Sequence, residues 1–194
     1  MNEDAAQKGA RSRVTGEDRL PGDPAPEELI ARMIRVDHAG EYGARRIYDG
    51  QLAVLGRSAS APAIREMAEA EQAHLDAFDA LLVERRVRPT ALAPVWHVAG
   101  YALGAASALL GERAAMACTV AVEEVIEEHY AGQAEKLGED EAELRQTLEE
   151  FGADEARHRE TGLEHGAEQA PGYEALSAAV KRGTRLAIWL SERI

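Results

Sequence analysis

The chain has 194 residues, enough for one domain with a sizeable core, and is 45% hydrophobic but only 5% aromatic. Its formal net charge of −13 argues against nucleic acid as a partner, because the phosphate backbone repels an acidic protein. The single cysteine, Cys118, excludes an internal disulfide and fits a reducing compartment, and no run of alternating β-branched residues predicts a sheet.

Residues 1–26 mix charged residues with glycine and proline, and prolines stand at positions 21, 24 and 26. This composition predicts a disordered N-terminal tail. The stretch has no apolar core of a signal peptide, and its basic residues alternate with acidic ones, so a transit peptide is not expected. We expect residues 27–194 to form one helical domain.

Two helices are predicted next, over about residues 27–55 and 61–87. The apolar face of the first carries Glu41 and Tyr48, and that of the second carries Glu71 and His74. Residues three apart on a helix lie on the same face, so Glu71 and His74 point in the same direction.

The segment from Pro89 to Gly111 contains no Asp, Glu, Lys or Arg in 23 positions. That length permits a membrane span, but prolines, glycines and polar residues interrupt the apolar run. We expect a crossover helix packed on a bundle, and two interpretations of its surface stay open. It lies in a membrane interface with the preceding Arg85, Arg86 and Arg88 near anionic headgroups, or it is a buried crossover beside ordinary solvated arginines.

The second half of the chain repeats the first. Helices are predicted over about 112–137 and 140–166, and Pro171 precedes a last amphipathic helix. Glu123 follows Glu41 by 82 positions, and Tyr130 follows Tyr48 by the same interval. Glu155 and His158 follow Glu71 and His74 by 84 positions, so the repeat places equivalent side chains on equivalent helices.

One Glu from each of two helices, with Glu-x-x-His from each of two others, is the arrangement of a carboxylate-rich dimetal centre. Taken singly, each Glu is explained by a solvated face and each His by a satisfied core position. Together, four buried carboxylates would repel one another, and two divalent cations remove that cost. Oxygen and imidazole ligands without thiolate suit iron or manganese and make a structural zinc site unexpected.

Several nearby residues have two interpretations. Asp154 either accepts the outer N–H of a ligating histidine or pairs with Arg157 on the surface. Tyr48 and Tyr130 either bond the glutamates or pack, and packing is slightly favoured. His129 is either a proton or electron relay or a surface histidine, and the surface position is favoured. His38 and His165 lie near these stretches at spacings that do not require ligation.

From about residue 28 to its end, the chain resembles the 5-demethoxyubiquinone hydroxylases of ubiquinone biosynthesis. The resemblance is carried by the strings RVDHAGEYGA at 35–44, RVRPT at 86–90, AMACTVAVEE at 115–124, GLEH at 162–165 and LSERI at 190–194. It implies an all-α, ferritin-like four-helix bundle with a crossover helix and a C-terminal helix. It also implies two iron ions held by Glu41, Glu71, His74, Glu123, Glu155 and His158.

The activity implied by the resemblance is hydroxylation of the demethoxyubiquinol ring with dioxygen. Electrons would come from the quinol or from a nicotinamide, and the protein would sit peripherally on the cytoplasmic face of a bacterial membrane. Homo-oligomers and partner proteins of ubiquinone biosynthesis are left open. Two alternatives remain: a ferritin-like ferroxidase or peroxide-handling protein, and a metal-free helical scaffold that binds partners through its charged faces.

Overall fold

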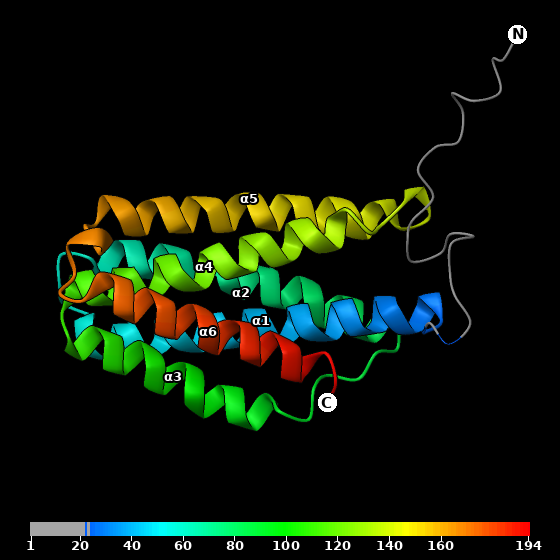
Figure 1. Ribbon diagram of the computed structural model, residues 1–194, viewed down its shortest axis with the longest axis horizontal. Coiled ribbons are helices and arrows are strands. Elements are labelled where there is room, and N and C mark those ends of the chain that lie inside the picture. The colour runs from blue at the N-terminus through cyan, green and yellow to red at the C-terminus, as the bar shows by residue number, and fades with distance from the viewer. Residues whose placement is uncertain (1–21, 23) are drawn as a thin grey trace, which may run out of the picture.

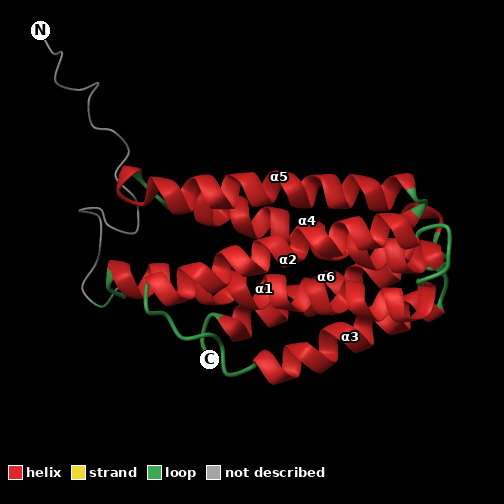
Figure 2. Ribbon diagram, turned by 180° about the vertical axis from the view of Figure 1, so that it is seen from behind, coloured by secondary structure: helices red, strands yellow, loops and turns green. Residues whose placement is uncertain are grey.

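A computed structural model of the chain describes residue 22 and residues 24–194. The predicted tail at 1–26 lies outside the described residues except for its last few positions. The described residues form helices and no strand, which confirms the predicted all-α fold class (Figure 2). Six α-helices lie in this described part of the chain: α1 (Pro26–Leu55), α2 (Ala61–Glu84), α3 (Ala93–Leu109), α4 (Glu112–Ala134), α5 (Ala142–Glu164) and α6 (Tyr173–Ser191).

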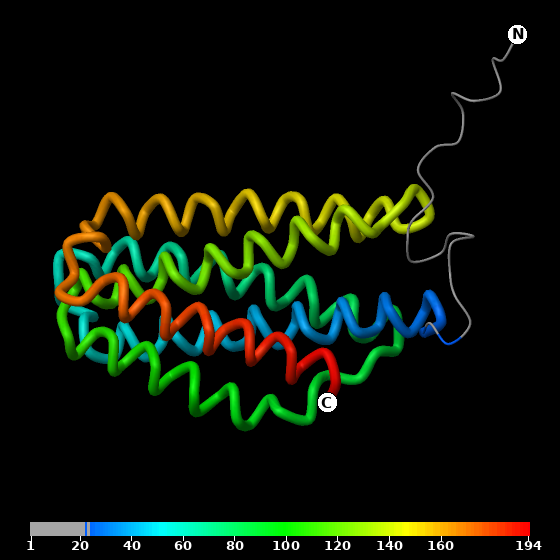
Figure 3. Tube along the Cα trace, viewed as in Figure 1, coloured from blue at the N-terminus to red at the C-terminus, as the bar shows by residue number. Residues whose placement is uncertain are grey.

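The helices run alongside one another in an elongated bundle (Figure 1). Helix α1 packs against α2 and α3, whereas α4 packs against α5 and α6, so the two halves of the sequence repeat form two helix pairs. Because α2 ends and α4 begins at opposite ends of the bundle, α3 crosses between them along its length (Figure 3). This arrangement confirms the predicted crossover and C-terminal helices.

Prolines and residues in the left-handed backbone conformation lie at several helix boundaries. Pro stands in the first turn of α1, α2 and α3, where its missing N–H would have no intrahelical partner. Helix α2 ends at Glu84 rather than at the predicted Val87, because Arg86 adopts φ 53° and Val87 N donates to Leu82 O at 2.9 Å. Glycine is the usual residue at such a closure, so an arginine in this place could not be predicted to end the helix.

The other predicted helix ends differ from the structure by a few residues. Helix α4 stops at Ala134, three residues before Leu137, and a short 3-10 turn (Glu139–Glu141) precedes α5. Gly166 (φ 79°) follows α5, and Gly172 (φ 72°) precedes α6, so these glycines mark two of the turns.

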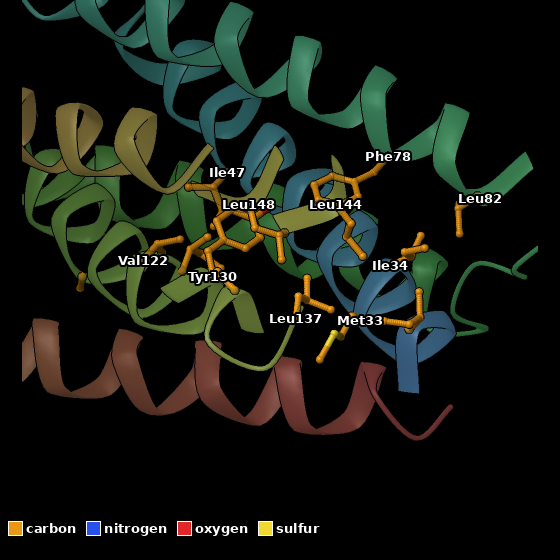
Figure 4. Packing of buried hydrophobic residues seen from close by; sticks show 14 of the residues in the cluster. Met33, Ile34, Ile47, Phe78, Leu82, Val122, Tyr130, Leu137, Leu144 and Leu148 are labelled. Carbon is orange, nitrogen blue, oxygen red and sulfur yellow. The ribbon is translucent and has the colours of Figure 1, made fainter. Parts of the chain in front are cut away.

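Two apolar clusters form the core. The larger joins residues of α1, α2, α4, α5 and α6 and includes Phe78, Tyr130 and Leu148, three of the side chains in Figure 4. The second includes Tyr48, Ile64 and Met116. Both clusters contain a tyrosine that faces the same interior region, which is therefore enclosed by apolar side chains.

The backbones of α3 and α1 lie unusually close together. A Cβ atom on Gly104 of α3 would lie 1.9 Å from the carbonyl oxygen of Ile47 in α1, and one on Gly50 would lie 2.2 Å from Tyr101 O. Only the inner face of α3 is covered, while Val95 and Val98 on its outer face are 51% and 66% exposed. The alternative interpretation of this segment as a buried crossover is therefore wrong.

Within the part of the chain that the structure describes, no helix has both the length and the apolar character needed to cross a bilayer.

Candidate metal centre

The structure brings the six predicted metal ligands together in the interior of the bundle. Four helices contribute: α1 and α4 one glutamate each, α2 and α5 one Glu-x-x-His pair each. All six polar side chains are buried, and apolar residues surround them. They form two overlapping groups in which the candidate donor atoms lie within 4.8 Å of one another: Glu41, Glu71, His74 and Glu155, and Glu71, Glu123, Glu155 and His158.

Two of the glutamates belong to both groups. Glu71 and Glu155 therefore lie between two positions, each completed by one further glutamate and one histidine. His74 Nδ1 lies 3.4 Å from Glu41 Oε2 and 3.2 Å from Glu155 Oε1. His158 Nδ1 lies 3.2 Å from Glu71 Oε1 and 3.0 Å from Glu155 Oε2. The sequence repeat thus becomes a pseudo-symmetric pair of sites.

The donor atoms of this cluster fit a cation. Among the described residues, several of its buried atoms lack a hydrogen-bond partner: both oxygens of Glu71, one oxygen each of Glu41, Glu123 and Glu155, and Nδ1 of His74. Leaving so many buried polar atoms unsatisfied is costly, and a metal ion satisfies lone pairs that point at one another. The buried Glu and His groups could therefore hold metal.

Without a cation, protons must balance the charge of the carboxylates. Burial and the nearby charge of Glu155 raise the pKa values of Glu41, Glu71 and Glu123 well above their ordinary range. Burial also opposes ionisation of Glu155, but hydrogen bonds from His158 and His74 outweigh it and lower its pKa to about 2. Burial opposes protonation of His158, yet Glu155 and Glu71 raise its pKa to about 11. Metal binding must therefore displace protons.

The two tyrosines of the repeat bond the glutamates of the opposite half. Tyr48 on α1 donates to Glu123 Oε1 on α4 at 2.6 Å, and Tyr130 on α4 donates to Glu41 Oε1 on α1. The slightly favoured interpretation, that both tyrosines only pack, is wrong. Each hydrogen bond fixes one carboxylate while its other oxygen stays free to bind a cation.

Asp154 has both of its predicted roles. His74 Nε2 lies 3.1 Å from Asp154 Oδ2, and Arg157 donates to the other carboxylate oxygen. Phe151 stacks on the His74 ring with 4.0 Å between centroids and 24° between planes. The sequence placed Phe151 on the inner face of its helix but gave no indication of this contact with a histidine.

An apolar cavity of about 310 Å³ lies between α1, α3, α4 and α6, and none of the six candidate ligands lines it. Gly40 and Ala44, which flank Glu41 along α1, form part of its wall, as do Val122 and Ile126, which flank Glu123 along α4. Trp96 of α3 and Ile188 of α6 close it from the outside. An apolar cavity of this kind is suited to binding a hydrophobic molecule, and two of its walls come from the helices that carry Glu41 and Glu123.

The family model described as ubiquinone biosynthesis protein COQ7 matches residues 28–191. The chain belongs to this family. The match spans all six helices apart from two residues at the start of α1, so the cluster and the cavity both lie within the COQ7-family part of the chain.

Relatives in bacteria, animals and fungi are similar over most of this COQ7-family chain. The 3-demethoxyubiquinol 3-hydroxylase of Rhodospirillum rubrum is 57% identical over 186 residues, covering 95% of this chain and 88% of the relative. The human mitochondrial NADPH-dependent 3-demethoxyubiquinone 3-hydroxylase is 52% identical over 169 residues, covering 85% and 78%. The mitochondrial 5-demethoxyubiquinone hydroxylase of Saccharomyces cerevisiae is 37% identical over 187 residues, covering 88% and 80%.

The four other histidines of the COQ7-family chain lie outside both groups, and one of them, His97, contacts the Tyr42 hydroxyl at 2.6 Å. His129 Nε2 lies 3.1 Å from Asp37 Oδ1, and its side chain is only 15% exposed, so the favoured interpretation as a surface histidine is wrong. His38 contacts Asp79 at 3.0 Å, and His165 contacts the carbonyl oxygen of Thr161. The relay interpretation of His129 stays a prediction.

Asp37 is a polar residue that sequence reasoning missed. It is fully buried on α1, one turn before Glu41, and accepts a hydrogen bond from Gln133 Nε2 at 2.9 Å. Burial raises its pKa, and His129 and Gln133 partly offset the effect. A carboxylate on an otherwise apolar face, next to a predicted ligand, was the available signal in the sequence.

Proposed function

We propose that this chain is a ferritin-like di-iron monooxygenase, formed by residues 27–194, that hydroxylates the ring of demethoxyubiquinol in ubiquinone biosynthesis. The observation that carries the proposal is the convergence of four glutamates and two histidines on two overlapping positions inside the bundle. The names of the relatives, which are hydroxylases of demethoxyubiquinol or demethoxyubiquinone, support the substrate.

The donor set supports two iron ions as the cofactor. Carboxylates and imidazoles without thiolate suit iron, and the Glu and Glu-x-x-His arrangement is that of dimetal bundle proteins. Glu41 and His74 would complete one position and Glu123 and His158 the other, with Glu71 and Glu155 shared by both. Two iron ions bound there would supply the chemistry that activates dioxygen.

The chain's own residues would hold and orient the substrate. The cavity walls formed by α1 and α4 include the chain neighbours of Glu41 and Glu123, and we propose that the substrate approaches the metal positions from this side of the bundle. Small residues such as Gly40 and Gly43 leave room for a flat ring. The apolar lining would exclude bulk water from the reacting atoms, which limits uncoupled reduction of dioxygen.

Exposed apolar side chains support peripheral attachment to a membrane. Val95 and Val98 of α3 and Leu186 and Trp189 of α6 are all about half exposed or more, and these two helices border the cavity. A quinol could then enter between α3 and α6 with its isoprenoid tail still in lipid. We propose that in a bacterium the protein attaches to the cytoplasmic face of the cell membrane and that the quinol or a nicotinamide is the reductant.

The test is hydroxylation under labelled dioxygen. Purified protein loaded with iron is given demethoxyubiquinol and a reductant under ¹⁸O₂, and the quinone product is analysed by mass spectrometry. We expect one labelled oxygen atom on the ring, because a monooxygenase inserts one atom of dioxygen. Hydroxylated product that carries oxygen from water would refute the monooxygenase reaction.

The same experiment separates the alternatives. Rapid oxidation of ferrous iron without any quinone product would show the ferroxidase reaction instead. A protein that binds no iron would support the metal-free scaffold. Glu71→Gln is the matched control for turnover, since it changes a residue shared by both positions and adds no bulk.

A further inference from the structure

The two halves of the centre differ in how their histidines are held. The glutamates are treated alike: Tyr48 bonds Glu123 and Tyr130 bonds Glu41, each from the opposite half of the repeat. The two histidines have different surroundings, although they occupy equivalent positions in the repeat. The asymmetry is therefore confined to one ligand type, and the tyrosine–glutamate pairs provide an internal reference.

His74 is held on two sides. Its outer nitrogen Nε2 lies 3.1 Å from Asp154 Oδ2, and its ring stacks on Phe151 with centroids 4.0 Å apart. Its side chain is only 3% exposed. In the neutral tautomer whose Nε2 donates to Asp154, Nδ1 presents its lone pair towards Glu41 and Glu155, as metal binding requires.

In the described part of the chain, His158 has no carboxylate on its outer nitrogen, and its nearest ring contacts, with Tyr48 and His74, are at 6.4 Å between centroids rather than 4.0 Å. Its Nδ1 faces Glu71 and Glu155, but its outer nitrogen Nε2 has no hydrogen-bond partner among the residues that the structure describes. With the repeat interval of 84 positions, Ala70 stands where Asp154 stands in the second half, and Met67 stands where Phe151 stands. A methyl group cannot accept the N–H of an imidazole, so the sequence itself removes the partner.

A carboxylate on the outer nitrogen of a ligating histidine strengthens metal binding. It fixes the tautomer, holds the ring in the binding orientation and makes the other nitrogen more basic. Removal of such a partner typically lowers metal affinity by about 10- to 100-fold. His158 must instead lose rotational freedom and select its tautomer when a metal binds.

We propose that the two metal positions are unequal, and that the position of His74 and Glu41 binds its ion first and about 10- to 100-fold more tightly. The position of His158 and Glu123 fills second and exchanges its ion more readily. This inference rests on the proposed dimetal centre and adds the order of loading. It assigns Asp154 and Phe151 as positioning residues for one ion only.

The test is a titration of the metal-free protein with Mn²⁺, followed by calorimetry and electron paramagnetic resonance. We expect two binding steps, with the spectrum of an isolated ion after one equivalent and a magnetically coupled spectrum after the second. His158→Gln should keep the tight step and His74→Gln should lose it. Two steps of equal affinity, or a tight step that survives in His74→Gln but not in His158→Gln, would overturn the inference.

Asp154→Ala should weaken the tight step by about 10- to 100-fold and bring the two steps together, while Asp154→Asn should have a smaller effect. Because Asp154 also binds Arg157, the matched control is Arg157→Ala, which removes that ion pair and leaves the His74 contact. An unchanged tight step in Asp154→Ala would refute the role of Asp154.

The converse variant, Ala70→Asp, installs the missing carboxylate and should tighten the second step. Thermal melting of each metal-free variant checks that it folds. If Ala70→Asp does not fold, the titrations of the two histidine variants decide whether the positions are unequal. Absence of any metal binding by the parent protein would refute the proposed function as well, whereas two equal sites would refute only the unequal loading.

Discussion

The hydroxyl group of Tyr48 on α1 lies 2.6 Å from Glu123 Oε1 on α4 and donates a hydrogen bond to it. This bond joins the two halves of the repeat inside the core, where both side chains are about 1% exposed. It leaves Glu123 Oε2 without a hydrogen-bond partner among the described residues. The tyrosine therefore selects which carboxylate oxygen is available to a cation.

Tyr48→Phe should weaken metal binding at the position of Glu123 while leaving the bundle folded. A hydrogen bond to a charged group contributes about 1.5–3 kcal/mol, so the affinity should fall about 10- to 100-fold. Calorimetric titration with Mn²⁺ measures the change. Tyr173→Phe is the control, because the hydroxyl of Tyr173 makes no hydrogen bond among the described residues. Equal affinities in the parent and Tyr48→Phe would contradict the role of this bond.

Gly104→Ala should destabilise the protein through the contact between α3 and α1. The added Cβ would lie 1.9 Å from Ile47 O, so the helices must separate, at a cost of about 1–3 kcal/mol or more. Urea unfolding measures the loss. The control is Gly132→Ala in α4, where a Cβ meets nothing within 4 Å and better helix propensity should stabilise by about 0.5–1 kcal/mol. Similar effects of both variants would show that α3 packs more loosely.

Much of this structure could be predicted from the sequence because the informative signals are local and repeated. Apolar residues at helical spacing predicted the helices, and the repeat predicted that Glu41, Glu71, Glu123 and Glu155 face one interior region. The tyrosine bonds, however, join residues 75 and 89 positions apart, and helical periodicity carries no information about which oxygen they meet. The same limit applies to the contact between Asp37 and His129, which depends on how α1 and α4 are rotated.

The metal-free protein should lose stability as the pH rises above about 6.5. The folded-state pKa of His158 is raised from 6.5 to about 11, so its stabilising contribution is complete below 6.5 and disappears towards 11. The raised pKa values of Glu41, Glu71 and Glu123 act in the same direction from 4.5 upwards. The pKa of Glu155 is instead lowered from 4.5 to about 2. Its contribution to stability is therefore lost only in acid, as the pH falls from 4.5 towards 2.

Urea unfolding of the protein, made metal-free with a chelator, at several pH values from 6 to 10 measures this dependence. His158→Gln is the control and should flatten the curve, since its side chain does not titrate. Added metal should reverse the trend, because binding displaces protons and tightens as the pH rises. A metal-free protein that becomes more stable between pH 7 and 9 would contradict the assignment.

Acidic substitutions on the outer face of α3 should weaken binding to lipid vesicles. Val95 and Val98 are 51% and 66% exposed, so Val95→Asp with Val98→Asp places charges on the face proposed to meet the membrane without touching the core. Flotation with vesicles containing anionic lipid measures binding. Val83→Asp on α2 is the matched control, since Val83 is 80% exposed on another helix. Equal loss of binding in the control would point to net charge rather than to this face.

Iron content should distinguish shared ligands from unshared ones. Glu71 belongs to both groups, whereas Glu41 belongs to one. After iron-replete expression the parent protein should contain about two irons per chain, as expected for a dimetal bundle centre. Glu71→Gln should lose nearly all of it, because each position loses a carboxylate, and Glu41→Gln should lose mainly the ion beside His74. Glu69→Gln, at an exposed position of the same helix, should keep the full content. Iron assays after gel filtration measure the three variants, and full retention by Glu71→Gln would rule out a shared carboxylate at that position.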